Sequence, residues 1–423
     1  MDPVRRTLLA VCVALVWTSA AFASGFQINE HGAKAMGMGG AFVAQASDPS
    51  AIFFNPAGLG FQKGFSAMLG ATLIMPATSH TAGGVTTDME SQIFYPPNAY
   101  ITYGLDSRWS FGLGFFAPYG LGTEWPAYWP GQRLAVKTEL QSFYINPAIA
   151  FSPIEELSIG VGFSYIFSNV ALNRRVGVTP TYSPSDGTVD LDADGTSWDF
   201  SVGILYKPVK EWSIGASYRH SAEVDYEGTA TFSNMPTLTT PIGSIPLAPY
   251  FPGGTGKTTI TMPNQGWLGV AVTPWSPFTM EADFQWTRWS TYEALAIDIP
   301  VGPVFPLTGR PLQGPSTSVK DWFDVFIARL GGEYRWEKVA LRLGVIYDFT
   351  PQPARSVEPL LPDANRWEGT IGLGYKFSKS FAVDVAYQFI MFSDRTATTP
   401  PAEFAGTYES NANLFGLNLT YTP

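Results

Sequence analysis

The side chains most able to do chemistry are three histidines, His31, His80 and His220, which are scattered along the 423-residue chain. An enzyme would need a general base beside a nucleophile, and a metal centre would need several His, Cys, Asp or Glu ligands at suitable spacing. Neither arrangement surrounds any of these histidines. The sequence therefore predicts no catalytic residue, no metal centre and no cofactor.

Two short motifs resemble loops that bind ions. Residues 254–258 read Gly-Thr-Gly-Lys-Thr, like the end of a phosphate-binding loop, but the earlier glycine of that loop is missing. Asp190, Asp192 and Asp194 have the spacing of a calcium loop, but Ser201 stands where that loop needs a bidentate glutamate. We discount the first motif, and a weak divalent-cation site in the second stays open.

The elements that position these residues are strands. After residue 60 the chain reads as about fourteen stretches in which apolar residues alternate with small or polar ones. Residues 157–167, 212–218 and 381–389 show the pattern most clearly. A period of two places one set of side chains on each face of a strand. We interpret the aromatic face as facing lipid and the small, polar face as lining a wet lumen, which predicts an all-β transmembrane barrel.

The N-terminus indicates export. Arg5 and Arg6 precede a short apolar core at residues 8–17, and residues 21–23 have the small-x-small pattern of a cleavage site. Residues 1–23 are therefore predicted to be a signal peptide. The single cysteine, Cys12, lies within it, so a disulfide scaffold is excluded from the mature chain. A net charge of −10 also argues against nucleic acid as a partner.

The connections between strands are expected to alternate in length, with short turns in the periplasm and long loops outside. Short turns are predicted at 104–107, 152–156, 208–210, 274–277, 336–338 and 378–380, and long loops near 76–91, 118–137, 172–195, 222–256, 290–319, 350–365 and 394–410. Tryptophans near both sets predict two interfacial girdles, with Trp109, Trp212, Trp275 and Trp336 on one side and Trp198, Trp289, Trp322 and Trp367 on the other. The alternative is a soluble all-β protein with buried tryptophans.

Residues 24–62 do not follow the strand pattern. They are rich in glycine and carry apolar side chains such as Phe26, Phe42, Phe53 and Phe54. This composition is too apolar for a solvated tail, and a wide barrel without a plug would leak. We predict that residues 24–62 form a plug, or hatch, in the lumen of a barrel formed by residues 63–423.

The fourth long loop is unusually apolar for a loop in water. The functional interpretation is a groove that captures an apolar solute, and the alternative is a loop that packs on its neighbours without a ligand. The groove residues would be Leu238, Ile242, Ile245, Leu247, Tyr250 and Phe251. Arg174 and Arg175 at the predicted third loop could pair with a carboxylate head group, or could be solvated charges at the rim.

Several segments, in this order, resemble the FadL-type outer-membrane transporters of long-chain fatty acids and aromatic hydrocarbons (OmpP1/FadL/TodX). They are residues 24–30 at the mature N-terminus, the Asn-Pro-Ala at 55–57, and residues 119–125, 348–353 and 361–366. The resemblance covers the whole mature chain. It implies a barrel of about 14 strands, a hatch, and an inward kink in the third strand.

The resemblance also assigns roles to particular residues. Asn55, Pro56, Ala57 and Phe26 would belong to the gating part of the hatch. Pro118, Tyr119 and Gly120 would form the kink, since proline and glycine do not support a regular ladder there. From its chemistry, Asn55 is expected to touch this kink, because its amide can satisfy backbone groups that the broken ladder leaves unpaired. Lys320 matches a lysine of the family and is a further candidate for pairing with a head group.

The predicted function is passive uptake of hydrophobic molecules across the outer membrane, with lateral release through the kinked strand. An aromatic-hydrocarbon channel, a structural or adhesive barrel, and an outer-membrane lipase are the alternatives. The expected partners are an apolar small molecule, membrane lipid, lipopolysaccharide and the barrel assembly machinery, and the barrel is expected to be a monomer. The C-terminus departs from the family, because the chain ends Tyr421-Thr422-Pro423 rather than on an aromatic residue.

Overall fold

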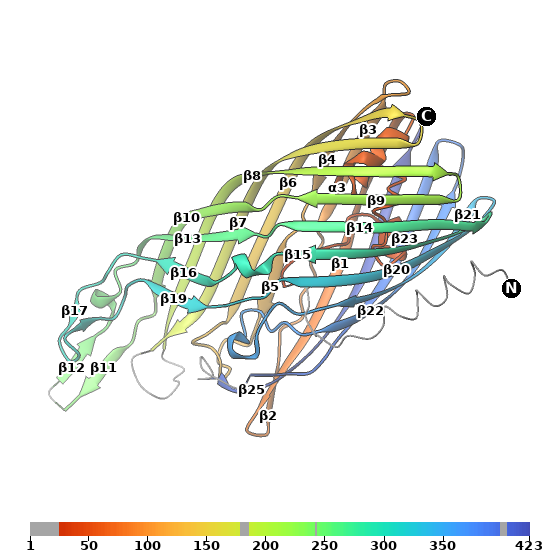
Figure 1. Cartoon of the computed structure of the whole chain (residues 1–423). Coiled ribbons are helices and arrows are strands. Elements are labelled where there is room, and N and C mark those ends of the chain that lie inside the picture. Colours follow the sequence, from red (N-terminus) through yellow and green to blue (C-terminus); the bar gives the residue numbers. More distant parts are fainter. Residues whose placement is uncertain (1–24, 178–185, 242, 398–403) are drawn as a thin grey trace.

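The computed structural model describes residues 25–177, 186–241, 243–397 and 404–423. Over these residues the strands form a closed antiparallel barrel of 14 strands (Figure 1). The last strand, β25 (Gly406–Tyr421), pairs with the first, β1 (Gly64–Ala82), from Ala67–Tyr421 to Thr81–Thr407. The predicted fold class is confirmed. Within the described part of the chain, no helix is both long and apolar enough to cross a bilayer.

Some strands of the wall are continuous and others are made of two segments. Besides β1 and β25, the continuous ones are β3 (Pro97–Gly104), β6 (Lys137–Ile154), β7 (Leu157–Val176), β8 (Gly187–Val209), β21 (Val339–Asp348) and β22 (Arg366–Lys376). The interrupted ones are β4 (Trp109–Phe116) with β5 (Gly120–Glu124), β9 (Trp212–Arg219) with β10 (Ala222–Ser233), β13 (Gly254–Met262) with β14 (Gln265–Trp275), β15 (Phe278–Thr287) with β16 (Ala294–Asp298), β19 (Ser316–Val319) with β20 (Val325–Trp336), and β23 (Phe381–Phe392) with β24 (Arg395–Ala397). Three further strand pieces belong to the outer loops: β2 (Val85–Asp88), the hairpin of β11 (Thr237–Thr240) and β12 (Gly243–Pro246), and the pair β17 (Val304–Phe305) and β18 (Arg310–Pro311).

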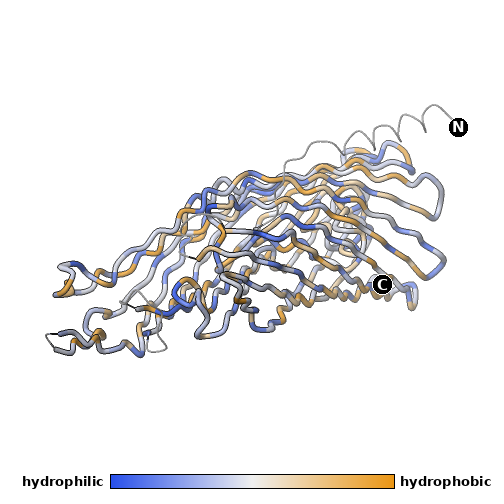
Figure 2. Tube along the Cα trace, turned by 90° about the horizontal axis from the view of Figure 1, so that it is seen from below, coloured by the Kyte–Doolittle hydropathy of each residue, from blue (hydrophilic) through white to orange (hydrophobic). Residues whose placement is uncertain are grey.

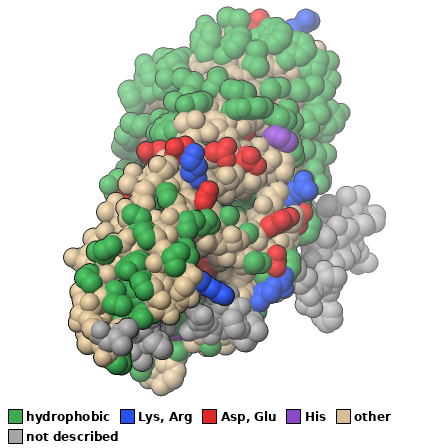
Figure 3. Space-filling model, turned by 90° about the vertical axis from the view of Figure 1, so that its left-hand side faces the viewer, with side chains coloured by type: hydrophobic (Ala, Val, Ile, Leu, Met, Phe, Trp, Pro, Cys, Tyr) green, Lys and Arg blue, Asp and Glu red, His purple; other side chains and the backbone are tan. Residues whose placement is uncertain are grey.

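Side chains alternate between the two faces of the wall as the sequence predicts. On β7, Phe163 and Tyr165 are exposed on the outside, whereas Ser158 and Ser164 are fully buried inside. The colours of the strands in Figure 2 alternate between hydrophobic and hydrophilic for the same reason. In Figure 3 hydrophobic side chains cover the wall at the top, and charged side chains gather on the outer-loop part nearer the viewer. The apolar outer face is the surface expected of a barrel in lipid.

The predicted outer girdle of tryptophans is half wrong. Trp198 and Trp367 are exposed, at 59% and 53%, but Trp289 and Trp322 are buried, at 0% and 4%. Both buried residues lie at interruptions, Trp289 after β15 and Trp322 before β20, where the strict alternation of faces is lost. Their rings point into the barrel, where they become part of the site described below.

The short turns fall where they were predicted, but the long loops begin later than expected. β10, the last residues of β7 and the first residues of β8 lie in stretches that were predicted to be loop, because the wall extends further at this end as a tilted sheet. The long hairpin of β7 and β8 keeps a regular register out to Val176–Gly187. The sequence does not predict this extension, because the outward-facing residues of these strands are polar and are typical of loops in water.

The N-terminal segment 25–62, called the hatch below, has little regular structure and is largely buried. It contains α2 (Ala33–Gly37), α3 (Ala51–Phe54) and the 3-10 helix η1 (Pro56–Phe61). α2 contacts β21, β22, β23 and β25, and η1 contacts β3, β4, β6, β7 and β8, which together surround the lumen. Glycines of the wall allow this close approach, since a Cβ at Gly160 would lie 2.3 Å from the backbone N of Ala57.

Candidate functional site

The third strand is interrupted at the predicted kink. β4 pairs with β3 on one side and β6 on the other, and β5 pairs with β6. Between them, the strand turns to the hatch: the N–H of Ile28 donates to the carbonyl of Pro118 at 2.8 Å, and the N–H of Gly120 donates to that of Phe26 at 3.0 Å. Residues 26–28 therefore act as a short strand inside the barrel, and Tyr119 bridges to Gln27.

The free edge of β5 faces residues 89–96, which continue the second strand. Across this edge, the backbone N–H of Glu90 donates to the carbonyl of Glu124 at 2.8 Å. Further along, the contact is made by a side chain: the ring of Phe94 lies over Gly122, so close that a Cβ at 122 would be 1.9 Å from it. Phe94 itself is held by two backbone bonds to Ile74. An aromatic ring thus occupies the place of ladder hydrogen bonds.

A cavity of about 920 Å³ passes through this part of the wall. Its lining includes Ile93 and Tyr95, which are 60% and 70% exposed. Its inner part is lined by side chains of the lumen, including Leu361, Ile390 and Leu414. The lining is mostly apolar and includes Pro97, Tyr119, Leu121, Leu140 and Phe143. Charged residues also line it: Glu30, Lys137, Glu139, Asp363 and Arg366. The cavity therefore joins the lumen to the outside at the height of the kink.

Phe26 of the hatch lies in a cage of aromatic rings. The centroid of its ring is 4.6 Å from that of Trp289, 5.7 Å from Tyr292, and 6.0 Å from both Trp322 and Tyr119. Edge-to-face contacts of this kind add to the free energy gained by burying the rings. The cage fixes the N-terminal end of the hatch directly beside the kink.

Lys320 lies next to this cage in a nearly filled cavity of about 60 Å³. The cavity is otherwise lined mainly by apolar side chains, among them Phe26, Leu121, Leu140, Ile260, Leu295 and Leu361. Lys320 is 3% exposed, and its ammonium group pairs with the carboxylate of Glu358 and donates to Ser318 Oγ at 3.1 Å. The predicted head-group cation is therefore already neutralised by a carboxylate of the chain.

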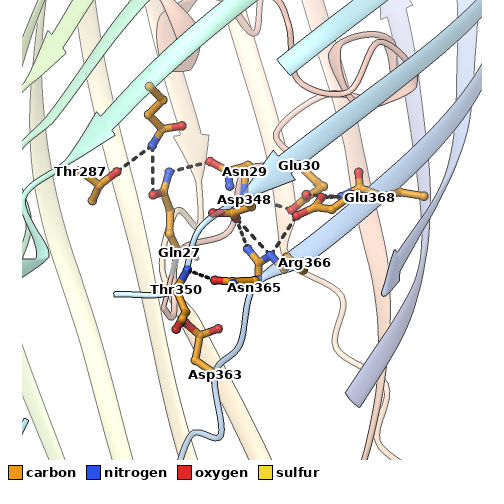
Figure 4. Close-up of polar contacts among 12 residues, drawn as sticks. Gln27, Asn29, Glu30, Thr287, Asp348, Thr350, Asp363, Asn365, Arg366 and Glu368 are labelled. Carbon is orange, nitrogen blue, oxygen red and sulfur yellow. Dashed lines mark hydrogen bonds and ion pairs between the residues drawn. The ribbon is translucent and has the colours of Figure 1, made fainter. Parts of the chain in front are cut away.

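A buried polar network holds the rest of the N-terminal end of the hatch (Figure 4). Gln388 Nε2 donates to Glu30 Oε1 at 2.9 Å, and Arg366 pairs with Asp348 at 2.7 Å and with Glu368 at 2.9 Å. A second contact runs from Gln285 Nε2 to Gln27 Oε1 at 3.1 Å. Figure 4 shows Asp348 at the end of β21 and Arg366 and Glu368 of β22 close to Glu30 of the hatch; Gln388, which bonds to Glu30, belongs to β23.

Asp363 borders both this network and the 920 Å³ cavity. It belongs to the loop between β21 and β22 and accepts a hydrogen bond from Thr350 Oγ1 at 2.6 Å. Burial raises the pKa of the Asp363 carboxyl to about 6. Near neutral pH part of the Asp363 population is therefore protonated, and a neutral carboxyl costs less to bury beside apolar side chains than a charged one.

Asn55 does not contact the kink, so that prediction is wrong. Its amide donates to the carbonyl of Val43 at 2.9 Å and to that of Ile204 on β8 at 3.1 Å, and its Oδ1 caps η1 at the N–H of Ala57. Pro56 and Ala57 are the first residues of η1 and are buried against the wall. The Asn-Pro-Ala motif thus fixes the hatch to a different part of the barrel, and the kink is met by Phe26 and Ile28 instead.

The residues proposed for the capture groove are packed together. Leu247 and Phe251 are buried and form a cluster with Phe305 of the fifth loop, against which Leu238, Ile245 and Tyr250 pack. Ile242 lies outside the described residues. The cluster lines neither cavity described above, and capture there stays a prediction.

The remaining candidate charges are on strands rather than loops. Arg174 is exposed on β7, and Arg175 stacks on Tyr128 and donates to Thr188 Oγ1 at 2.9 Å. Asp190, Asp192 and Asp194 share the outer face of β8, which is extended and lacks the turn of a calcium loop. Within the described residues, His, Cys, Asp and Glu side chains form no group of three or more that could hold a metal.

Comparisons with known proteins agree with this architecture. The family model "Outer membrane protein transport protein (OMPP1/FadL/TodX)" matches residues 14–422. The long-chain fatty acid transport protein of Salmonella typhi is 25% identical over 443 residues, covering 98% of each chain. A FadL homologue of Pseudomonas aeruginosa has a similar structure, with a TM-score of 0.80 at 18% identity over 94% of this chain and 99% of that one. The toluene transporter TodX of P. putida gives 0.73 at 18% identity, over 95% and 98%.

Proposed function

The chain belongs to the outer-membrane transport family OMPP1/FadL/TodX, and from this membership and the site above we propose that it takes up hydrophobic molecules by passive diffusion and releases them sideways into the membrane. It is a β-barrel protein of the bacterial outer membrane, in a family of transporters of hydrophobic compounds. The observation that carries lateral release is the 920 Å³ apolar cavity at the interrupted third strand.

The proposed path has three stages. Cargo lands on the outer loops and enters the lumen near Phe26, where residues 25–31 must move to enlarge the small cavity beside Lys320. It then passes between Phe94 and Gly122 into the bilayer. Lipid is the better destination, since each buried methylene group gains roughly 0.8 kcal/mol relative to water. No energy source is needed, because the cargo moves down its own gradient of free energy.

We infer that the cargo is uncharged at the site beside Lys320. A fatty acid would bring a carboxylate that must compete with Glu358 for the same ammonium group. Separating a buried ion pair is costly, because it leaves a charge without a partner in an apolar site. Hydrocarbons meet no such cost, so aromatic or aliphatic hydrocarbons fit the site better than long-chain carboxylates. A toluene transporter is among the similar structures.

Phe94 is expected to set the width of the exit. Phe94→Ala removes the ring that covers Gly122 and should raise the uptake of a broad polycyclic hydrocarbon several-fold, whereas Phe94→Trp should lower it. The measurement is the initial rate of uptake of labelled naphthalene by cells that lack their own transporters. Phe389→Trp, on the exposed outer face of β23, is the matched control and should transport like wild type. Equal rates in all four proteins would show that cargo leaves elsewhere.

The topology gives a second test. Lys379 lies in a short turn and Ser244 lies on the outer hairpin of β11 and β12. A cysteine at Ser244 should react with a membrane-impermeant maleimide in intact cells, and one at Lys379 only after the periplasm is opened. The mature chain offers no competing thiol if residues 1–23 are cleaved. Labelling at Lys379 in intact cells would show that the barrel has the opposite orientation in the membrane.

We also propose that the barrel is inserted by the barrel assembly machinery, contacts lipopolysaccharide and is a monomer.

A further inference from the structure

Residues 42–45 of the hatch are held to the wall by two carboxylates of β15. The backbone N–H groups of Phe42 and Val43 donate to Asp283 Oδ2 at 2.8 and 3.0 Å. The next two N–H groups donate to the two oxygens of Glu281, at 2.6 and 3.0 Å. All of these groups are buried, except for the partly buried residue at 45. Two side chains of one strand therefore accept hydrogen bonds from four consecutive backbone N–H groups of the hatch.

The neighbouring strands are shaped around the same four residues. Ser213 Oγ on β9 donates to the carbonyl of Ala44 at 2.6 Å. A Cβ at Gly215 would lie 2.3 Å from the carbonyl oxygen of Val43, and one at Gly269 on β14 would lie 2.2 Å from Asp283 Oδ1. Side chains at these glycines would push the hatch or the carboxylate away. Three adjacent strands thus leave room for the hatch and supply its hydrogen-bond partners.

The N-terminal end of the hatch is held in a different way. Residues 26–28 pair with the edge of an interrupted strand, and Gln27 and Glu30 are held by the amides of Gln285 and Gln388. Residues 42–45 are therefore held by two side chains of one strand, whereas residues 25–31 are held by a broken strand edge and by side chains that border the cavities.

We propose that Glu281 and Asp283 are positioning residues that fix residues 42–45 and keep the barrel closed to water-soluble molecules while the N-terminal end of the hatch moves. Without the carboxylates, four buried N–H groups would lack partners, and the hatch would leave its place to hydrate them. This sealing role is separate from the transport of apolar cargo. It predicts a leak when the carboxylates are removed, whatever the path of the cargo.

The test measures the leak directly. The full-length barrel with Glu281→Ala and Asp283→Ala is placed in liposomes, and the rate of swelling in arabinose is recorded. We expect swelling several-fold faster than with wild type, while the barrel still shows its folded, heat-modifiable migration on gels. Glu281→Gln alone should give an intermediate leak, because a glutamine keeps one acceptor oxygen and turns an N–H group toward the second donor.

A matched control separates this effect from a general loss of charge. Asp225→Ala with Glu227→Ala removes two carboxylates at the same spacing from the exposed face of β10 and should leave swelling unchanged. Wild-type swelling in the folded Glu281, Asp283 double variant would overturn the proposal. If that variant does not fold, wild-type swelling in Glu281→Gln overturns it. Hydrocarbon uptake, measured in parallel, reports on the transport function independently.

Discussion

Straightening the third strand is expected to abolish uptake while leaving the barrel folded. In the double variant Pro118→Val with Gly120→Val, position 118 regains a backbone donor and both positions favour extended backbone. The strand can then continue from β4 into β5 and pair with residues 92–96, which closes the gap in the wall. Valine at 120 also meets Ile28, since a Cβ there would be 2.8 Å from its Cδ1. The initial rate of hydrocarbon uptake by whole cells is the measurement.

The control for this variant is a proline that does not interrupt a strand. Pro147 lies on the outer face of β6, beside Leu113 of β4. Pro147→Val should transport at the wild-type rate, and both proteins should resist unfolding by detergent until heated. If the straightened barrel is folded and still transports like wild type, cargo must leave by another route, and lateral release is wrong.

The sequence predicts the barrel well because the barrel follows from local rules. The alternation along residues 157–167 depends only on which face of a strand meets lipid, and short turns interrupt the pattern visibly. The interruption at Pro118 and Gly120 is also predictable, since both residues act on their own backbone. The sequence does not predict β10, the last residues of β7 or the first residues of β8 as strand, because their outer faces are polar although their inner faces are buried.

The site itself is predicted only in part, because it is made by contacts between distant segments. Phe26 was assigned to the gate, but its cage of Trp289, Trp322 and Tyr292 depends on two other interruptions of the wall. The sequence does hold a sign of this cage, because a tryptophan beside a strand interruption need not lie on the outer face of the wall. The chemistry of the Asn55 amide predicts a contact with the kink, but in the structure that amide bonds to Val43 and Ile204.

Two other features had no sequence signal. Gly122 lies under the ring of Phe94, and one glycine among 42 does not stand out. Glu358 neutralises Lys320, yet 38 residues separate them, and the loop that carries Glu358 folds back onto the lumen. The pairing changes the chemistry of the site from cationic to neutral, so a motif that matches a lysine of the family does not by itself identify the cargo.

Breaking this pair is expected to change the charge preference of the transporter. Burial lowers the pKa of Lys320 to about 7, so Glu358→Gln leaves an amine that is readily neutralised unless a cargo carboxylate replaces Glu358. A cargo carboxylate can then supply the missing negative charge, and a charge-assisted bond there is worth about 1–2 kcal/mol, or roughly a tenfold gain in affinity. Uptake of labelled oleate at low concentration should rise by about tenfold relative to wild type, and uptake of toluene should change little.

The matched controls separate a head-group site from a loss of packing. Asp321→Asn breaks the exposed pair with Arg355 and should change neither rate, since exposed pairs contribute little. Lys320→Met with Glu358→Gln removes both charges and should keep the uptake of toluene while losing the gain for oleate.

One result would contradict the inference of an uncharged cargo. If Lys320→Met alone lowers oleate uptake about tenfold in an otherwise unchanged chain, the ammonium binds cargo despite Glu358. The natural cargo would then carry a carboxylate, because a buried cation that exchanges one carboxylate for another selects acids over hydrocarbons.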